Sequence, residues 1–215
     1  MVTLDAKNKV LFSGDAFGCF GALNGGIIDM EINCETFWLE MVRYYSNIVG
    51  KYGIPVQNAL KKLAGVELDY ICSTHGPVWH EHIEKVIGMY DKMSKYETEP
   101  GLVICYGTMY GNTENAANVL AGMLADKGVK NIAMYDVSET DVSELVAESF
   151  RCSHLVFACP TYNNGLFTKM ETVMSEIKAH NLQNRTVALM ENGTWPHGCK
   201  ADACRAGRHE EHHRL

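Results

Sequence analysis

The feature that most constrains this chain is a regular alternation of short apolar strands and amphipathic helices between residues 102 and 190. The predicted strands are 102–106, 132–135, 155–159 and 187–190, and the predicted helices are 113–126, 142–150 and 168–180. Such alternation predicts a parallel sheet with helices on both faces and right-handed crossovers. Ligands of open sheets of this class bind beyond the carboxyl ends of the strands. The loops 107–113, 160–167 and 191–195 are therefore expected to converge on one site.

Residues 1–94 also alternate short strands with amphipathic helices. The predicted strands are 10–12 and 70–72, and the predicted helices are 35–49, 56–63 and 81–93. The polar segment 95–101 ends in Pro-Gly, which is typical of a hinge between domains. We therefore predict two domains, 1–94 and 102–195, joined by this linker.

Composition narrows the class of protein. Charged residues make up 21% and hydrophobic residues 47% of the 215 residues, so the chain can form a packed core. The formal net charge is -7 and no basic stripe is present, which argues against a nucleic-acid partner. No apolar run approaches the roughly 18 residues that a membrane span needs, and no export signal is visible. The eight cysteines include no CxxC pair and are expected to be reduced thiols of a cytoplasmic protein.

The loop 107–113 lies between a predicted strand and the start of a predicted helix. That position offers unpaired backbone N–H groups and the positive end of a helix dipole, both of which suit a phosphate. No lysine follows as in GxxxxGK[ST], so a nucleoside triphosphate with magnesium is disfavoured. An ordinary helix cap at Thr113 is the alternative. The residues expected to bind a phosphate are Thr108, Met109, Tyr110, Gly111, Asn112 and Thr113.

The other two loops supply aromatic and amide side chains. An aromatic ring can cover a planar ligand, and amides can bond to the polar edge of its ring. The run Thr-x-Tyr-Gly-Asn-Thr at 108–113 resembles the phosphate loop of flavodoxins, and the order of all three loops on consecutive strand ends predicts FMN binding. The further residues expected to contact FMN are Pro160, Thr161, Tyr162, Asn163, Asn164, Gly165, Asn192, Gly193, Thr194 and Trp195.

Two residues of the first half follow predicted strands in positions where metal ligands could lie. Asp15 comes after the strand 10–12 and precedes a glycine-rich stretch, and His75 comes after the strand 70–72. A loop cap and a surface histidine are the plain alternatives. Two ligands also do not close a metal site, since non-haem iron usually takes at least two histidines and a carboxylate per ion.

Five motifs in order resemble a flavodiiron protein, also called an A-type flavoprotein: DAFGCFG, STHGPVW, YGTMYGNTE, PTYNNGLF and ENGTW. The resemblance implies a metallo-β-lactamase-like domain with two irons, a flavodoxin-like domain with FMN, and reduction of dioxygen to water or of nitric oxide to nitrous oxide. By position it implies that Asp15 is the bridging aspartate and His75 the last iron-ligating histidine. The expected fold is α/β, with the C-terminal part of a metallo-β-lactamase-like αββα domain followed by an incomplete doubly wound flavodoxin-like parallel sheet.

The sequence departs from the family pattern at both ends. In the family an H-x-E-x-D-H run and a later histidine precede the aspartate, so four of the six iron ligands are missing here. After Trp195 the sequence no longer resembles the family, and we hypothesise that a frameshift makes 196–215 an aberrant tail. We therefore expect a chain truncated at its N-terminus, with strand 187–190 as an exposed sheet edge and with marginal stability.

Three functions stay open at this point. The expected one is an FMN-binding electron-transfer fragment of a flavodiiron oxygen or nitric oxide reductase, without diiron catalysis of its own. The others are a stand-alone flavodoxin-like electron carrier and an inactive product of a truncated gene, so the sequence does not decide whether the chain is an enzyme. The resemblance implies a redox partner such as rubredoxin or a flavin, F420 or nicotinamide reductase, and assembly as a homodimer.

Overall fold

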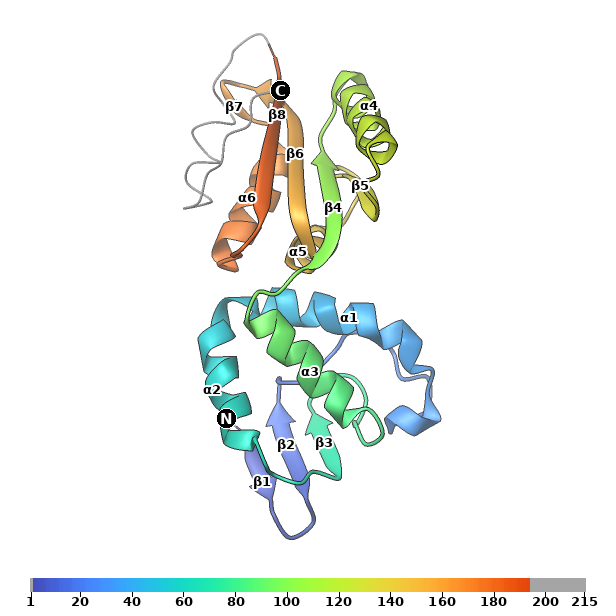
Figure 1. The fold of residues 1–215 in the computed structure, drawn as a ribbon, viewed down its shortest axis with the longest axis vertical. Coiled ribbons are helices and arrows are strands. Elements are labelled where there is room, and N and C mark those ends of the chain that lie inside the picture. Colours follow the sequence, from blue (N-terminus) through green and yellow to red (C-terminus); the bar gives the residue numbers. More distant parts are fainter. Residues whose placement is uncertain (1, 194–215) are drawn as a thin grey trace. The chain divides into compact units, whose positions relative to one another are not determined.

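The computed structural model describes residues 2–193, and the chain forms two compact units that divide between Glu97 and Thr98 (Figure 1). The division falls inside the polar segment 95–101. Both units mix strands with helices, and the expected α/β class with a parallel sheet is confirmed. Over the described residues, no helix is both long enough and apolar enough to cross a membrane.

The C-terminal unit is built on a parallel sheet in the order β5-β4-β6-β8. Its strands are β4 (Glu99–Tyr106), β5 (Ile132–Asp136), β6 (Cys152–Tyr162) and β8 (Thr186–Asn192). A two-residue strand, β7 (Gly165–Leu166), folds back antiparallel onto the end of β6. In the described residues β8 pairs with β6 alone. Because β4, β6 and β8 run parallel, their carboxyl ends meet at one edge of the sheet.

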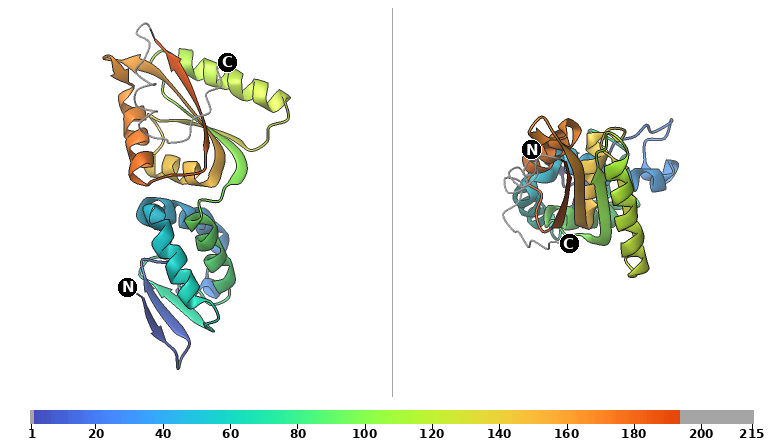
Figure 2. Two further views of the ribbon diagram at one scale, coloured as in Figure 1. Left: turned by 60° about the vertical axis from the view of Figure 1, so that its left-hand side comes forward. Right: turned by 90° about the horizontal axis from the view of Figure 1, so that it is seen from above.

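Helices cover both faces of this sheet (Figure 2). Helix α4 (Asn112–Asp126) lies on one face, and α5 (Val142–Arg151) and α6 (Thr168–Ala179) pack against each other on the opposite face. The apolar layer under α4 comprises Leu102, Ile104, Ala117 and Val156, with Tyr106, Leu120, Ala121, Leu124, Ile132, Met134 and Met190 packed around them.

The hydrophobic pattern of the sequence predicts only part of the buried face of α4 correctly. The sequence pattern predicts that Ala116, Val119, Leu120 and Met123 are buried. Leu120 packs against the core, but Val119 and Met123 are each more than half exposed and Ala116 is exposed. The buried side chains are instead Thr113 and Ala117, one turn apart on the stripe that faces the sheet. Leu120, Ala121 and Leu124 continue this stripe, so Val119 and Met123 lie on the other side of the same helix.

The N-terminal unit has a smaller sheet of three strands in the order β1-β2-β3. They are β1 (Thr3–Asp5), β2 (Val10–Gly14) and β3 (Tyr70–Ser73); β1 is antiparallel to β2, and β2 is parallel to β3. The helices α1 (Phe37–Tyr44), α2 (Gly53–Leu63) and α3 (Ile83–Ser94) lie beside this sheet (Figure 1). The fully buried side chains include Leu11, Met41, Ile71, Trp79 and Tyr90.

Short elements join these helices. They are the 3-10 turns η1 (Asp29–Glu31), η2 (Cys34–Thr36) and η4 (Gly50–Tyr52) and the π-helical turn η3 (Tyr45–Val49). The single helix predicted over 35–49 is therefore η2, α1 and η3 in succession. Strands β1 and β7 were not predicted, because runs of three and two residues are too short to show an alternating pattern.

A buried carboxylate holds the chain segment that enters α3. The side chain of Asp29 is 3% exposed and accepts hydrogen bonds from the backbone N–H groups of His80, Glu81 and His82. These N–H groups precede or open the helix and lack intrahelical acceptors. Asp29 therefore ties the loop after β3 to η1.

The π-helical turn η3 leaves one buried polar atom without a partner. Tyr45 is 0% exposed, and its hydroxyl has no hydrogen-bond partner within the described residues. A buried hydroxyl of this kind costs about 1–3 kcal/mol. We therefore expect Tyr45→Phe to raise the free energy of unfolding of the N-terminal unit by up to about 2 kcal/mol, as measured by urea unfolding.

Tyr96 offers the matched control for this substitution. Its hydroxyl is also buried but donates to the backbone oxygen of Gly50 at 3.0 Å. Tyr96→Phe should therefore lower the free energy of unfolding by about 1 kcal/mol. Equal destabilisation by both substitutions would show that the Tyr45 hydroxyl is satisfied after all.

Candidate functional site

The first loop of the site connects β4 to α4. Gly111 caps the helix with φ of 80°, in the left-handed region that favours glycine, and no atom lies within 4 Å of the position its Cβ would take. The backbone N–H of Gly111 donates to Thr108 Oγ1 at 3.0 Å. Met109 and Tyr110 are 44% and 88% exposed, so the tip of the loop faces solvent. The first turn of α4 thus presents backbone N–H groups at an open edge.

The second loop is a tight hairpin between β6 and β7. Tyr162 pairs with Gly165, which leaves Asn163 and Asn164 as the two turn residues. Their φ values of 49° and 60° lie in the left-handed region, which asparagine tolerates better than most residues. Tyr162 is 51% exposed. The hairpin therefore holds an aromatic ring and two amides at the end of β6.

The third loop begins where β8 ends. Asn192 lies opposite Pro160 in the parallel register, and its side-chain amide donates to Thr113 Oγ1 at 3.4 Å. A Cβ on Gly193 would lie 2.0 Å from Thr161 Oγ1, so only glycine permits this approach. The end of β8 therefore contacts both other loops. Thr194 and Trp195, also predicted to contact FMN, lie outside the described residues.

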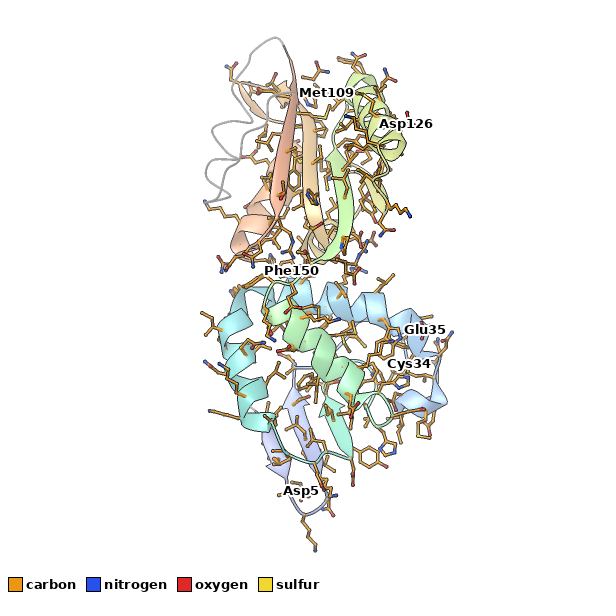
Figure 3. All side chains as sticks on the ribbon, viewed as in Figure 1. Asp5, Cys34, Glu35, Met109, Asp126 and Phe150 are labelled. Atoms are coloured by element: carbon orange, nitrogen blue, oxygen red, sulfur yellow. The ribbon has the colours of Figure 1, made fainter. Side chains whose placement is uncertain are left out.

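The three loops line a small hollow that is open to solvent and has a cavity volume of about 40 Å³. It lies at the end of the C-terminal unit where Figure 3 labels Met109, opposite the end that carries Phe150. The residues that line it come from all three loops: Thr108, Met109, Tyr110, Asn112, Thr113, Pro160 and Asn192. The predicted convergence of the loops is thus present in the structure.

The lining of the hollow combines polar and apolar groups and carries no charged side chain. It offers hydroxyl and amide donors together with the N-terminus of a helix of 15 residues. A helix N-terminus stabilises an anion through its N–H groups and its dipole. Neutral donors of this kind fit the phosphorylated tail of FMN.

Carboxylates surround the same edge of the sheet. Burial, together with the nearby charges of Glu114 and Asp136, raises the pKa of Tyr106 above its usual value. Lys169 is the one basic side chain at this edge within residues 98–193. The acidic side chains at strand ends and helix starts are Glu114, Asp136, Glu139, Asp141, Glu144, Glu171 and Glu191.

Sequence reasoning missed one pair of residues that shapes the site. A Cβ on Gly107 would lie 2.5 Å from Cδ1 of Phe167, so the ring of Phe167 occupies the space beside this glycine. Gly107 also donates its N–H to the backbone oxygen of Ala158 at 2.8 Å. The pair packs the start of the first loop against the start of α6. A glycine directly after a buried strand was the available signal.

The N-terminal unit brings the two predicted metal ligands together. Because β2 and β3 are parallel neighbours, the loops that follow them are adjacent, and Asp15 Oδ1 lies 3.7 Å from His75 Nε2. Thr74 Oγ1 donates to Asp15 Oδ1 at 2.9 Å. Both side chains are more than half exposed. The Tyr44 ring lies 5.7 Å from the His75 ring, centroid to centroid, and burial followed by the charge of Asp15 raises the pKa of Tyr44 to about 12.

The described residues add no third candidate ligand to Asp15 and His75. Across residues 2–193, no cluster of three or more His, Cys, Asp or Glu side chains is arranged to hold a metal ion. His80 and His82 follow in the sequence, but His80 stacks on Tyr70 and His82 lies against Trp38. Within residues 2–193, Asp15 and His75 are thus the two predicted ligands that lie together.

Comparisons with known proteins agree with this geometry. The flavodoxin family model matches residues 104–201. The chain is 32% identical over 170 residues to an uncharacterized protein of Methanocaldococcus jannaschii, covering 79% of this chain and 42% of that protein. It is 25% identical over 201 residues to the anaerobic nitric oxide reductase flavorubredoxin of Shigella dysenteriae, covering 92% of this chain and 42% of the relative.

Solved structures extend the likeness to both units. The rubredoxin oxygen:oxidoreductase of Desulfovibrio gigas is similar with a TM-score of 0.89 at 25% identity, covering 96% of this chain and 53% of that one. The flavodiiron protein of Giardia intestinalis has the same fold, with a TM-score of 0.89 at 22% identity over 95% of this chain and 51% of that one. The chain thus spans about half the length of these relatives.

The parallel sheet and its three converging loops define a flavodoxin-like domain. With the relatives that match across both units, the chain is a flavodiiron-like protein. A domain of this class implies FMN as its cofactor, and the parent family carries a diiron centre as well.

The contact between Gly107 and Phe167 can be tested by substitution. We expect Gly107→Ala to displace the Phe167 ring, lower the midpoint of thermal unfolding and weaken FMN binding, because the added methyl group overlaps the ring. Adding Phe167→Leu should recover much of both losses. Thermal unfolding and FMN titration measure the two effects.

Gly122 in α4 provides the matched control, since no atom lies within 4 Å of its Cβ position. Gly122→Ala should stabilise the helix by roughly 0.5–1 kcal/mol. If Gly107→Ala is as well tolerated as Gly122→Ala, the close contact with Phe167 is not important.

Proposed function

We propose that this chain is an FMN-binding electron-transfer polypeptide of the flavodiiron type that does not assemble a diiron centre from its own residues. The single observation that carries the proposal is the hollow where all three loops meet at the carboxyl ends of β4, β6 and β8. FMN bound there supplies one- and two-electron transfer. On this proposal 102–195 is the flavin domain and 95–101 its linker to the domain 1–94.

The proposed FMN contacts divide by chemistry. Thr108, Gly111, Asn112 and Thr113 would hold the phosphate with hydroxyl and N–H donors at the start of α4. The rest of FMN would be surrounded by residues of all three loops. They are Met109 and Tyr110 of the first loop, Pro160, Thr161, Tyr162, Asn163, Asn164 and Gly165 of the hairpin, and Asn192 and Gly193 at the end of β8. The exposed rings of Tyr110 and Tyr162 support this division, because a planar ring can stack on them.

The proposal that the chain does not assemble a diiron centre rests on the number of ligands. Asp15 and His75 supply two donors, whereas a non-haem iron usually takes at least two histidines and a carboxylate. The pair is also exposed to solvent, which favours exchange of any bound ion. We therefore propose that reduction of dioxygen or nitric oxide is not an activity of this chain alone.

A second candidate function is a share in an iron centre. The 3.7 Å separation of Asp15 and His75 and the bond from Thr74 favour it, because both side chains are already placed on adjacent loops. In either case the electrons would come from a redox protein such as rubredoxin or from a flavin, F420 or nicotinamide reductase. A homodimer is the assembly that we propose to test.

Titration of the chain with FMN tests the proposal directly. We expect FMN fluorescence to be quenched on binding, and Thr108→Val to weaken binding about tenfold, because its hydroxyl orders the loop through the Gly111 N–H. Thr172→Val removes a hydroxyl from the exposed side of α6 and should leave the affinity unchanged. Unquenched fluorescence with excess FMN would refute the flavin assignment.

Iron analysis of the purified chain separates the two candidate functions. Material reconstituted with ferrous iron should hold far less than one iron per chain if Asp15 and His75 are only a pair. A content of about two irons per chain, the number in the parent family's centre, would favour the second candidate. Loss of that iron in Asp15→Ala and His75→Ala would identify its ligands.

Salt dependence tests whether neutral groups hold the phosphate. Raising the salt from about 0.01 M to about 0.1 M shortens the Debye length from about 30 Å to about 10 Å. No basic side chain lines the hollow, and the carboxylates of Glu114 and Asp136 act on Tyr106 at the same edge of the sheet, so FMN affinity should stay constant or rise. A fall of about tenfold would instead indicate that lysine or arginine binds the phosphate.

A further inference from the structure

The side chain of Asn192 connects the end of β8 to the first turn of α4, which are two parts of the proposed flavin site. It lies at the last residue of β8, and its amide donates to Oγ1 of Thr113 at 3.4 Å. Thr113 lies in the first turn of α4 and is 3% exposed. Within residues 2–193, Asn192 is the hydrogen-bond partner of this hydroxyl.

This bond determines what the Thr113 hydroxyl can do. A threonine hydroxyl has one hydrogen to donate and two lone pairs to accept with. When the Asn192 amide donates to a lone pair, the hydroxyl hydrogen stays available for another acceptor. A threonine in a helix often donates instead to a carbonyl one turn earlier, which would turn its hydrogen away from a ligand. Both residues line the hollow, so the free hydrogen can reach an acceptor there.

The position of Asn192 is itself well determined by its neighbours. The parallel register places it opposite Pro160 on β6. The next residue, Gly193, lies so close to Thr161 that a Cβ would be 2.0 Å from the threonine hydroxyl. The amide is therefore held by a strand pairing on one side and a close backbone approach on the other.

We propose that Asn192 is a positioning residue that orients the Thr113 hydroxyl toward the phosphate and thereby makes the site selective for FMN over riboflavin. This inference rests on the proposed function, because it assumes that the phosphate lies at the start of α4. The chain Asn192 Nδ2–H to Thr113 Oγ1–H to a phosphate oxygen gives a charge-assisted hydrogen bond at its last step. Riboflavin lacks the phosphate and gains nothing from that bond.

The test compares FMN and riboflavin affinities by fluorescence titration of the full chain. Asn192→Ala should weaken FMN binding by about 10- to 100-fold, the range for a bond to a charged group, and change riboflavin affinity by less than about twofold. Thr113→Val should do the same. The double variant should bind FMN no more weakly than Thr113→Val, because both substitutions remove one chain of bonds.

Two further variants distinguish loss of the hydrogen bond between Asn192 and Thr113 from a general effect on folding. Asn192→Asp keeps the side-chain shape but accepts the Thr113 hydrogen instead of donating, so it should lower FMN affinity at least as much as Asn192→Ala. Asn115→Ala removes an exposed amide from the same helix and should leave both affinities unchanged.

Each outcome decides between the two proposals. Equal losses of FMN and riboflavin affinity in Asn192→Ala, or additive losses in the double variant, would overturn the positioning role while the flavin site stands. An Asn192→Asp chain that binds FMN as well as the unmodified chain would also overturn it. If the unmodified chain binds neither compound, the proposed function fails and the positioning role fails with it.

Discussion

Parallel pairing of adjacent strands is the constraint on which both halves of this molecule depend. In the C-terminal unit the pairings of β4 with β6 and of β6 with β8 bring three strand ends to one edge, so loops about 50 and 30 residues apart in sequence share one hollow. In the N-terminal unit the parallel pairing of β2 with β3 does the same for Asp15 and His75, which are separated by about 60 residues. A register shift of one residue in either sheet would turn these loops to other directions.

Close contacts at two glycines also hold the loops of the C-terminal unit in place. Gly107 makes room for the Phe167 ring, and Gly193 makes room for the Thr161 hydroxyl. Each contact joins a loop to the element beside it, so the loops of the C-terminal unit support one another without charged side chains. This suits an anion that is bound by hydroxyl and N–H groups, because such donors bind more tightly when their directions are set beforehand.

The sequence predicts the elements and the convergence of the loops well, because apolar runs such as 102–106 in β4 and glycine-rich loops leave clear patterns. It predicts side-chain environment less well. Val119 and Met123 are exposed because α4 turns the stripe of Ala117, Leu120 and Leu124 toward the sheet, and several faces of this helix carry apolar residues. The contact of Asn192 with Thr113 joins residues 79 positions apart and leaves no local pattern. Whether the predicted residues bind FMN stays a prediction.

The loops that carry Asp15 and His75 show why the two halves of the proposed function can be separated. Their shape is maintained by protein groups: Cys19 donates its N–H to the backbone oxygen of His75, and Thr74 donates its N–H to the backbone oxygen of Gly14. The Asp15 carboxylate in turn accepts from the Thr74 hydroxyl. Because these bonds need no metal ion, the adjacent placement of the two side chains follows from the fold. The N-terminal unit can therefore keep Asp15 and His75 adjacent whether or not it holds iron. The iron content of the chain and the stability of its fold can then be measured independently of each other.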